Sequence, residues 1–264
     1  MFYDTHVQSF RIAADLMKSS STIQGRGLSE FFIREGKSGA IHPILHSLDT
    51  PVRAIVLPVT DLNAVEGIAR SLNELLPEQQ FGTMLWYQNL SLLHSTLYHA
   101  STHSDPVPAT EEQIEAEYGA IVRAATDLCP VIGVLDSIVF TDSGTLLALW
   151  HVAQGGSGIS SEEPANIRNT LRQVLPNASK SQVVHDDIIF HTTLARLAVT
   201  DGSDPSILRS LATAASAITA RLCGLQARLD VMWYVEEYDV LSLSLNVRLK
   251  VRNVPLNGCT DAIP

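Results

Sequence analysis

One short pattern occurs twice in the chain and limits what it can fold into. The segments 94–97 (HSTL) and 191–194 (HTTL) are separated by 97 positions, and each ends an apolar run typical of a β-strand, 90–97 and 188–194. Side chains alternate between the two faces of a strand, so the histidine and the residue two places later share a face. If the two strands lie side by side, two imidazoles and two hydroxyls converge on one spot. We therefore expect a fold that brings these strands together.

The repetition is what makes the pattern informative. A single histidine two places before a threonine has little specificity, because strands tolerate both residue types as ordinary half-buried positions. Of the nine histidines in the chain, only His94 and His191 are followed by x-Thr-Leu. The shared sequence and the shared strand context favour a functional pair over coincidence.

Two histidines and two hydroxyls suit the chemistry of a phosphodiester. One imidazole can take a proton while the other gives one, and the hydroxyls can hold an anionic group between them. In-line attack by water needs the base and the acid on opposite sides of phosphorus. With an ordinary histidine pKa near 6.5, one imidazole can be neutral and the other charged at neutral pH. We predict His94 and His191 as the acid–base pair, with Thr96 and Thr193 as ligands of the phosphoryl oxygens.

From residue 51 the chain alternates strand and helix patterns twice in similar order. Such an order predicts an α+β fold of two lobes, each a small antiparallel sheet backed by helices, with a central cleft lined by the motifs. Residues 1–50 lie outside this repeat and are taken as an N-terminal extension, 51–252 as the domain and 253–264 as a C-terminal tail. The expected strands are 53–59, 84–98, 131–140, 145–152, 188–194 and a final return strand, 241–251, which has the clearest period-2 pattern; helices are expected after Asp61, Thr110, Pro164 and Asp204.

Composition limits the partners. The formal charge of −10 repels long nucleic acids, whereas a small nucleotide or a short RNA end needs only local positive groups. No uncharged apolar stretch reaches the roughly 18 residues of a membrane span, so we expect no membrane partner, and we take the chain as a monomer. Three cysteines without Cys-x-x-Cys spacing indicate neither a disulfide framework nor a thiolate zinc site. We therefore expect a soluble, cytoplasmic protein in a reducing compartment.

The motifs and the order of the elements resemble the 2H phosphoesterase superfamily, also called 2′-5′ RNA ligase-like proteins or cyclic phosphodiesterases. The resemblance spans about residues 51–252, and the stretches 94–108, 134–150 and 188–197 resemble an uncharacterised plant and algal branch of that superfamily. It implies a pseudo-symmetric bilobal fold and hydrolysis of a cyclic, 2′,3′-type, or 2′-linked nucleotide phosphodiester without metal or cofactor.

The same resemblance implies the roles of particular residues. By position, one of His94 and His191 acts as general base and the other as general acid, and the motif threonines bind the phosphoryl oxygens. Several members carry a basic or aromatic residue five places after the second histidine, where this chain has Arg196, a further candidate phosphate ligand. Strand alternation places Arg196 on the opposite face from His191 unless the strand bends or ends at Leu194.

Other residues leave alternatives open. Tyr98 shares the predicted face of His94, and Trp150 and Tyr234 lie on strand runs, so each is a candidate for stacking on a nucleobase, although strand aromatics are usually core. One alternative function is a non-catalytic module that binds a nucleotide or an RNA end. Another is a metal-dependent hydrolase built on His94, His99 and His103.

Overall fold

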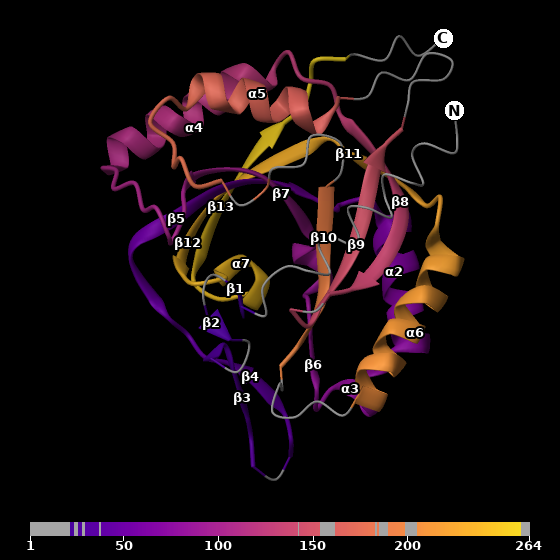
Figure 1. Cartoon of the computed structure of the whole chain (residues 1–264). Coiled ribbons are helices and arrows are strands. Elements are labelled where there is room, and N and C mark those ends of the chain that lie inside the picture. Colours follow the sequence, from indigo (N-terminus) through magenta and orange to yellow (C-terminus); the bar gives the residue numbers. More distant parts are fainter. Residues whose placement is uncertain are drawn as a thin grey trace.

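The chain folds into two larger antiparallel sheets that meet in the computed structural model (Figure 1). The structure describes residues 22–23, 26–27, 30–36, 38–141, 143–153, 162–182, 184, 190–198 and 205–259. The five-stranded sheet has the order β11-β8-β9-β10-β6, with β6 at Leu85–Tyr87, β8 at Val131–Phe140, β9 at Thr145–Val152, β10 at Phe190–Leu197 and β11 at Gln226–Leu229. The four-stranded sheet has the order β13-β12-β5-β7, with β5 at Ser47–Pro58, β7 at His94–Ser101, β12 at Val231–Asp239 and β13 at Leu249–Pro255. Two further pairs are β1 (Thr22–Ile23) with β2 (Arg26–Gly27) and β3 (Phe32–Arg34) with β4 (Ile41–Pro43).

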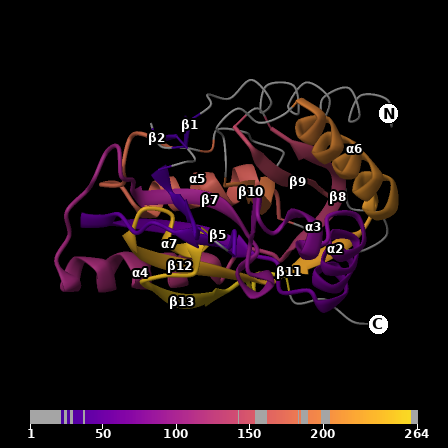
Figure 2. The same ribbon diagram turned by 90° about the horizontal axis from the view of Figure 1, so that it is seen from below.

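Helices pack on both sheets. α2 (Leu62–Leu75) and α6 (Pro205–Leu222) lie together beside the five-stranded sheet, while α4 (Glu111–Ala125) and α5 (Pro164–Val174) lie against the four-stranded sheet (Figures 1 and 2). The expected α+β class, with antiparallel sheets backed by helices, is confirmed. Single turns also occur in the described part of the chain, among them α3 (Glu78–Phe81), η2 (Leu90–Leu92) and α7 (Ser242–Leu245). Within the described ranges, no helix is long and apolar enough to cross a bilayer.

Two of the expected helix starts have the side-chain caps that the sequence indicates. Asp61 accepts a hydrogen bond from the amide of Ala64 at 3.1 Å and caps α2. Thr110 and Gln113 form a reciprocal capping box at the start of α4. These caps satisfy backbone donors that a helix start leaves without partners. The predicted start at Asp204 lies outside the described residues.

The two halves of the sequence exchange strands between the sheets. The first motif strand, β7, pairs with β5, and β5 pairs in turn with β12 from the end of the chain. The second motif strand, β10, pairs with β9 and also with β6 from the first half. The repeated element order therefore does not correspond to two lobes that follow one another along the chain.

The predicted return strand 241–251 is wrong over its first part. Leu241 and Asn246 adopt left-handed backbone conformations, with φ of 60° and 54°, and they flank the single turn α7. The Ser242 hydroxyl donates to the carbonyl of Asp239 at 2.8 Å and accepts from its amide at 2.9 Å. These contacts turn the chain, and Leu243 and Leu245 are buried inside the turn rather than on one face of a strand. The strand β13 begins only at Leu249.

Other predicted boundaries also shift. The strand expected over 84–98 is divided into β6, the 3₁₀ turn η2 and β7, so the first motif begins its strand instead of ending it. β10 begins at Phe190, and positions 188–189 of the predicted run lie outside the described residues. Phe31 and Phe32 are 0% and 5% exposed, and Leu256 is 3% exposed. Residues on both sides of 51–252 therefore pack into the core.

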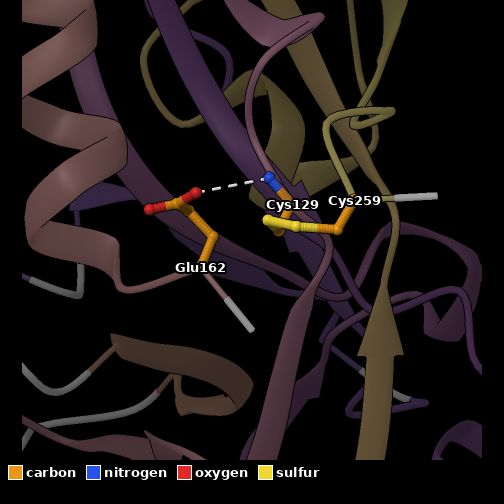
Figure 3. Close-up of a disulfide and its surroundings, with 3 residues drawn as sticks. All are labelled: Cys129, Glu162 and Cys259. Atoms are coloured by element: carbon orange, nitrogen blue, oxygen red, sulfur yellow. Dashed lines mark hydrogen bonds between the residues drawn. A yellow bond between two sulfur atoms is a disulfide. The ribbon is translucent and has the colours of Figure 1, made fainter. Parts of the chain in front are cut away.

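The expectation about cysteines is wrong for two of the three. Cys129 and Cys259 form a disulfide with a Cα–Cα distance of 4.7 Å (Figure 3). The amide of Cys129 donates to Glu162 at 3.3 Å, and the amide of Gly258 donates to the carbonyl of Leu128 at 2.7 Å. The odd count and the wide spacing concealed this pair, because only the fold brings position 259 back to position 129.

Candidate functional site

The two motif strands lie side by side although they belong to different sheets. The hydroxyls of Ser95 and Thr192, the middle residues of the two motifs, are 2.8 Å apart, and both residues are 0% exposed. The indole N–H of Trp150 also donates to the Thr192 hydroxyl at 3.1 Å. A buried bond between the motifs thus fixes β7 against β10.

The motif histidines and threonines lie on the other faces of these strands. Ser95 and Leu97 are buried in β7, while His94 and Thr96 are half-buried. In β10 the burial alternates in the same way, with His191 and Thr193 half-buried. The charge of His191 lowers the pKa of His94, so the two imidazoles interact through space. The four polar side chains, His94, Thr96, His191 and Thr193, are the less buried members of their motifs.

His94 is held in one tautomer by its own backbone. Its Nδ1 lies 2.7 Å from the carbonyl of Leu92, and because a carbonyl only accepts, Nδ1 carries the proton. Asn89 caps the preceding 3₁₀ turn, which sets the direction of that carbonyl. Burial lowers the pKa of His94 to about 4, with the positive charges of Arg196 and His191 acting in the same direction and the Leu92 bond opposing them. His94 is therefore neutral at neutral pH, with a lone pair on Nε2.

A β-bulge resolves the position of Arg196. The register of β10 against β9 shifts between Thr193 and Ala195, so Leu194 is the extra residue. Thr193 lies opposite Leu147 and Arg196 opposite Thr145, two places along the same strand, so the arginine shares the face of Thr193. Its guanidinium contacts the hydroxyls of Thr145 at 3.4 Å and Thr193 at 3.5 Å. The simple alternation that places Arg196 on the far face does not hold, because the bulge resets it.

The same irregularity in β7 removes Tyr98 from the candidate site. The register against β5 shifts between Ile55 and Val56, which makes Leu97 the extra residue. Tyr98 therefore turns into the core and is 6% exposed, and His99 occupies the face of His94 and Thr96. The stacking role expected for Tyr98 does not fit this position.

The other two proposed stacking residues are also core. Trp150 is 0% exposed and stacks on Phe190 with ring centroids 6.3 Å apart. Tyr234 is 0% exposed and donates its hydroxyl to Glu117 at 2.8 Å. Neither ring has a free face for a nucleobase, since strand aromatics pack first against neighbouring strands and helices.

Two residues that the sequence did not single out lie on the motif face of the four-stranded sheet. Val56 pairs with Thr96 on one side and with Trp233 on the other, so Trp233 lies in the same row as Thr96, two strands away. Trp233 is half-buried. Glu237, four residues along β12, shares the face of Trp233. Alternation in the sequence separates Trp233 from Tyr234, but only the sheet register shows which of them faces the motif.

The three-histidine metal site is not supported. Within the described part of the chain, no group of three or more His, Cys, Asp or Glu is arranged to hold a metal ion. The backbone of His99 is bonded to the side chain of Gln182. The Gln182 amide group accepts from the backbone N–H of His99 and donates to the carbonyl of His99, both at 2.9 Å. Burial lowers the pKa of His99 to about 4, with the nearby charge of His103 acting in the same direction.

Fold and site together define an α+β protein built on two contacting His-x-Thr strands. No family model matches the chain, and no curated protein matches it significantly. Solved structures similar to it include a conserved protein of unknown function from Agrobacterium tumefaciens, with a TM-score of 0.54 at 15% identity, covering 78% of this chain and 86% of that one. At this identity, the likeness shows a shared fold and assigns no activity.

Two further similar structures are named proteins. LigT of Escherichia coli, in complex with 3′-AMP, has a TM-score of 0.45 at 13% identity over 79% of this chain and 96% of LigT. Usb1 of Kluyveromyces marxianus, with uridine monophosphate, has a TM-score of 0.44 at 15% identity over 78% of this chain and 98% of Usb1. At these identities and TM-scores, both likenesses concern the arrangement of helices and strands and carry no argument about activity.

Proposed function

We propose that this protein is a metal-independent phosphodiesterase that hydrolyses a cyclic, 2′,3′-type, or 2′-linked nucleotide phosphodiester. The observation that carries the proposal is the buried contact of β7 with β10, which brings two His-x-Thr pairs to one place. Paired histidines supply a base and an acid, and paired hydroxyls supply donors to the phosphoryl oxygens. Each part of this chemistry is present on the chain itself.

In this proposal His94 is the general base. Its Nδ1–H is bonded to Leu92, and its Nε2 lone pair takes the proton of the attacking water. As the new P–O bond forms, the bond from phosphorus to one ribose oxygen breaks, and His191 gives that oxygen a proton. Water and the cyclic diester become a monoester and a free hydroxyl. Thr96, Thr193 and Arg196 hold the non-bridging oxygens as negative charge develops on them.

Trp233 takes the place of the excluded aromatics as the candidate for base stacking. It lies about 10 Å from Thr96, since neighbouring strands are about 4.8 Å apart. A nucleoside attached to a phosphate at the motif spans such a distance. Its half-buried indole offers a face that any base can stack on.

Turnover of a panel of 2′,3′-cyclic nucleotides and 2′-5′-linked dinucleotides, with and without EDTA, tests the function. We expect turnover that EDTA leaves unchanged, with NMR of the product showing whether the 2′ or the 3′ phosphate remains. Loss of turnover in EDTA would favour the metal-dependent alternative. Nucleotide binding without any turnover would favour the binding module.

A further inference from the structure

Arg196 is a buried cation with incomplete partners. The residue is 8% exposed, and its two side-chain hydrogen bonds go to neutral hydroxyls at 3.4 and 3.5 Å. Its Nε is buried and has no hydrogen-bond partner among the residues that the structure describes. Burying a charge is costly unless an opposite charge compensates for it. Some nearby anion must therefore help to keep the guanidinium beside Thr193.

Glu237 is the acidic residue whose location suits this role. It is half-buried on the motif face of the four-stranded sheet, where β12 pairs with β5. Burial lowers the pKa of Arg196 to about 10, with the carboxylate of Glu237 acting in the opposite direction. Burial raises the pKa of Glu237 to about 7, against the lowering effects of the hydrogen bond from Leu243 and of the Arg196 guanidinium. The two side chains therefore interact through space between the two sheets.

Backbone contacts hold Glu237 in this position. The amide of Leu243, in the turn α7, donates to its Oε1 at 2.6 Å. The carbonyl of Leu243 accepts from the side chain of Gln88 at 3.3 Å, and the amide of Gln88 donates to the carbonyl of Leu194 at 2.9 Å. Leu194 is the bulged residue that turns Arg196 onto the motif face. A continuous chain of contacts thus joins the bulge to Glu237 through Gln88 and α7.

We propose that Glu237 is a positioning residue, the counter-ion that α7 and Gln88 hold beside Arg196 so that the guanidinium stays at the phosphoryl subsite. This inference rests on the proposed function, because it assigns Arg196 to a phosphoryl group. Glu237, on the four-stranded sheet, would act through Arg196 and would contact neither the substrate nor the reacting atoms. The two sheets would then share one binding site through the electrostatic interaction of these two side chains.

A double-mutant cycle tests whether Glu237 acts through Arg196. E237Q keeps an acceptor for the Leu243 amide but removes the charge. We expect this variant to bind inorganic phosphate about tenfold more weakly and its KM for a cyclic nucleotide to rise by a similar factor. Its kcat should change less than about threefold. In an R196M background, E237Q should change phosphate affinity less than about twofold, because the group it positions is gone. Equal effects of E237Q in both backgrounds would overturn the proposal.

E236Q is the matched control. Glu236 is the neighbouring residue on the opposite face, 3% exposed, and it pairs with Arg252 at 2.8 Å and Lys250 at 3.6 Å. We expect E236Q to lower thermal stability and to leave phosphate affinity unchanged. Loss of phosphate affinity in E236Q as large as in E237Q would show a general structural effect and contradict the assignment.

Stability gives a readout that does not depend on turnover. Each single variant leaves one buried charge without its partner, whereas R196M/E237Q leaves neither, so the double variant should melt above both single variants. If E237Q alone does not fold, the double variant should still fold. A double variant that melts below both singles, or also fails to fold, would overturn the pairing. A wild type that binds phosphate with this coupling but turns over no nucleotide would contradict only the proposed function.

Discussion

The two motif strands have the same local plan and different surroundings. In each, the residue three places after the histidine is bulged, which turns the residue five places after it onto the motif face. In β7 that residue is His99, and the motif histidine is fixed by the carbonyl of Leu92. In β10 it is Arg196, which contacts Thr193. In the proposed function this repeated scaffold would carry unequal roles, a neutral base on one strand and a phosphate-binding cation on the other.

The largest expected effect comes from the histidines themselves. H94A and H191A should each lower kcat by at least about 10², the low end for general acid–base catalysis, while the circular dichroism spectrum stays that of the wild type. T96A and T193A should cost less, because each removes one hydrogen bond and leaves the proton transfers in place. Full activity of the H94A/H191A double variant would show that the chemistry lies elsewhere.

The residues five places after each histidine test the inequality of the strands. R196M should raise KM by about tenfold or more, since it removes a charge-assisted contact to a phosphoryl oxygen. H99Q, at the matched position of β7, should change KM less than about threefold, because His99 contributes no cation at neutral pH. Steady-state kinetics on R196M and H99Q measures both KM values. Equal losses would mean that the two strands serve the substrate alike.

The nucleobase should lie against only one sheet. W233A should raise KM by about fivefold or more for a cyclic nucleotide, the range for loss of one stacked base, without changing the affinity for inorganic phosphate. Trp86 is the control on the other sheet. It lies opposite Arg196 in the register of β6 with β10, and the ring centroids of Trp86 and Phe32 are 5.8 Å apart. W86A should lower the melting temperature instead. A base-dependent KM effect confined to W86A would reverse this assignment.

The smallest expected effect is on the pH profile. His94 must be neutral to act as a base, so kcat/KM should fall as the pH falls through its pKa of about 4. Because the positive charge of Arg196 helps to lower that pKa, R196M should move this acidic limb to higher pH. A limb that stays in place in R196M, measured with wild type in the same buffers, would contradict the coupling between the two strands.

Local features were predictable from the sequence, and register was not. The caps at Asp61 and Thr110 depend on residues within one turn, so their sequence patterns were sufficient. The bulges at Leu97 and Leu194 depend on how a strand fits its neighbour, which no pattern within the strand contains. Their effect is large: one removed Tyr98 from the motif face, and the other placed Arg196 on it.

Period-2 alternation also failed where a turn could bury the same residues. Leu241, Leu243 and Leu245 read as one face of a strand, yet left-handed residues at both ends turn the segment into α7. Glu237 and Trp233 escaped prediction for a related reason. A strand shows which residues share a face, but the identity of the face comes from distant partners such as Val52 and Val56.

The exchange of strands between the halves of the chain has a consequence for folding. The sheet that carries the first motif contains β12 and β13, so His94 reaches its final surroundings only after β12 pairs with β5 and β13 pairs with β12. Contacts between such distant segments form slowly, because the long intervening loop must close before they are gained. During synthesis the first motif strand is made long before its sheet can be completed. The first motif is therefore the later of the two to reach its final surroundings. A chain shortened before β12 would keep every strand of the five-stranded sheet but would lose the strand that pairs with β5 in the sheet of His94.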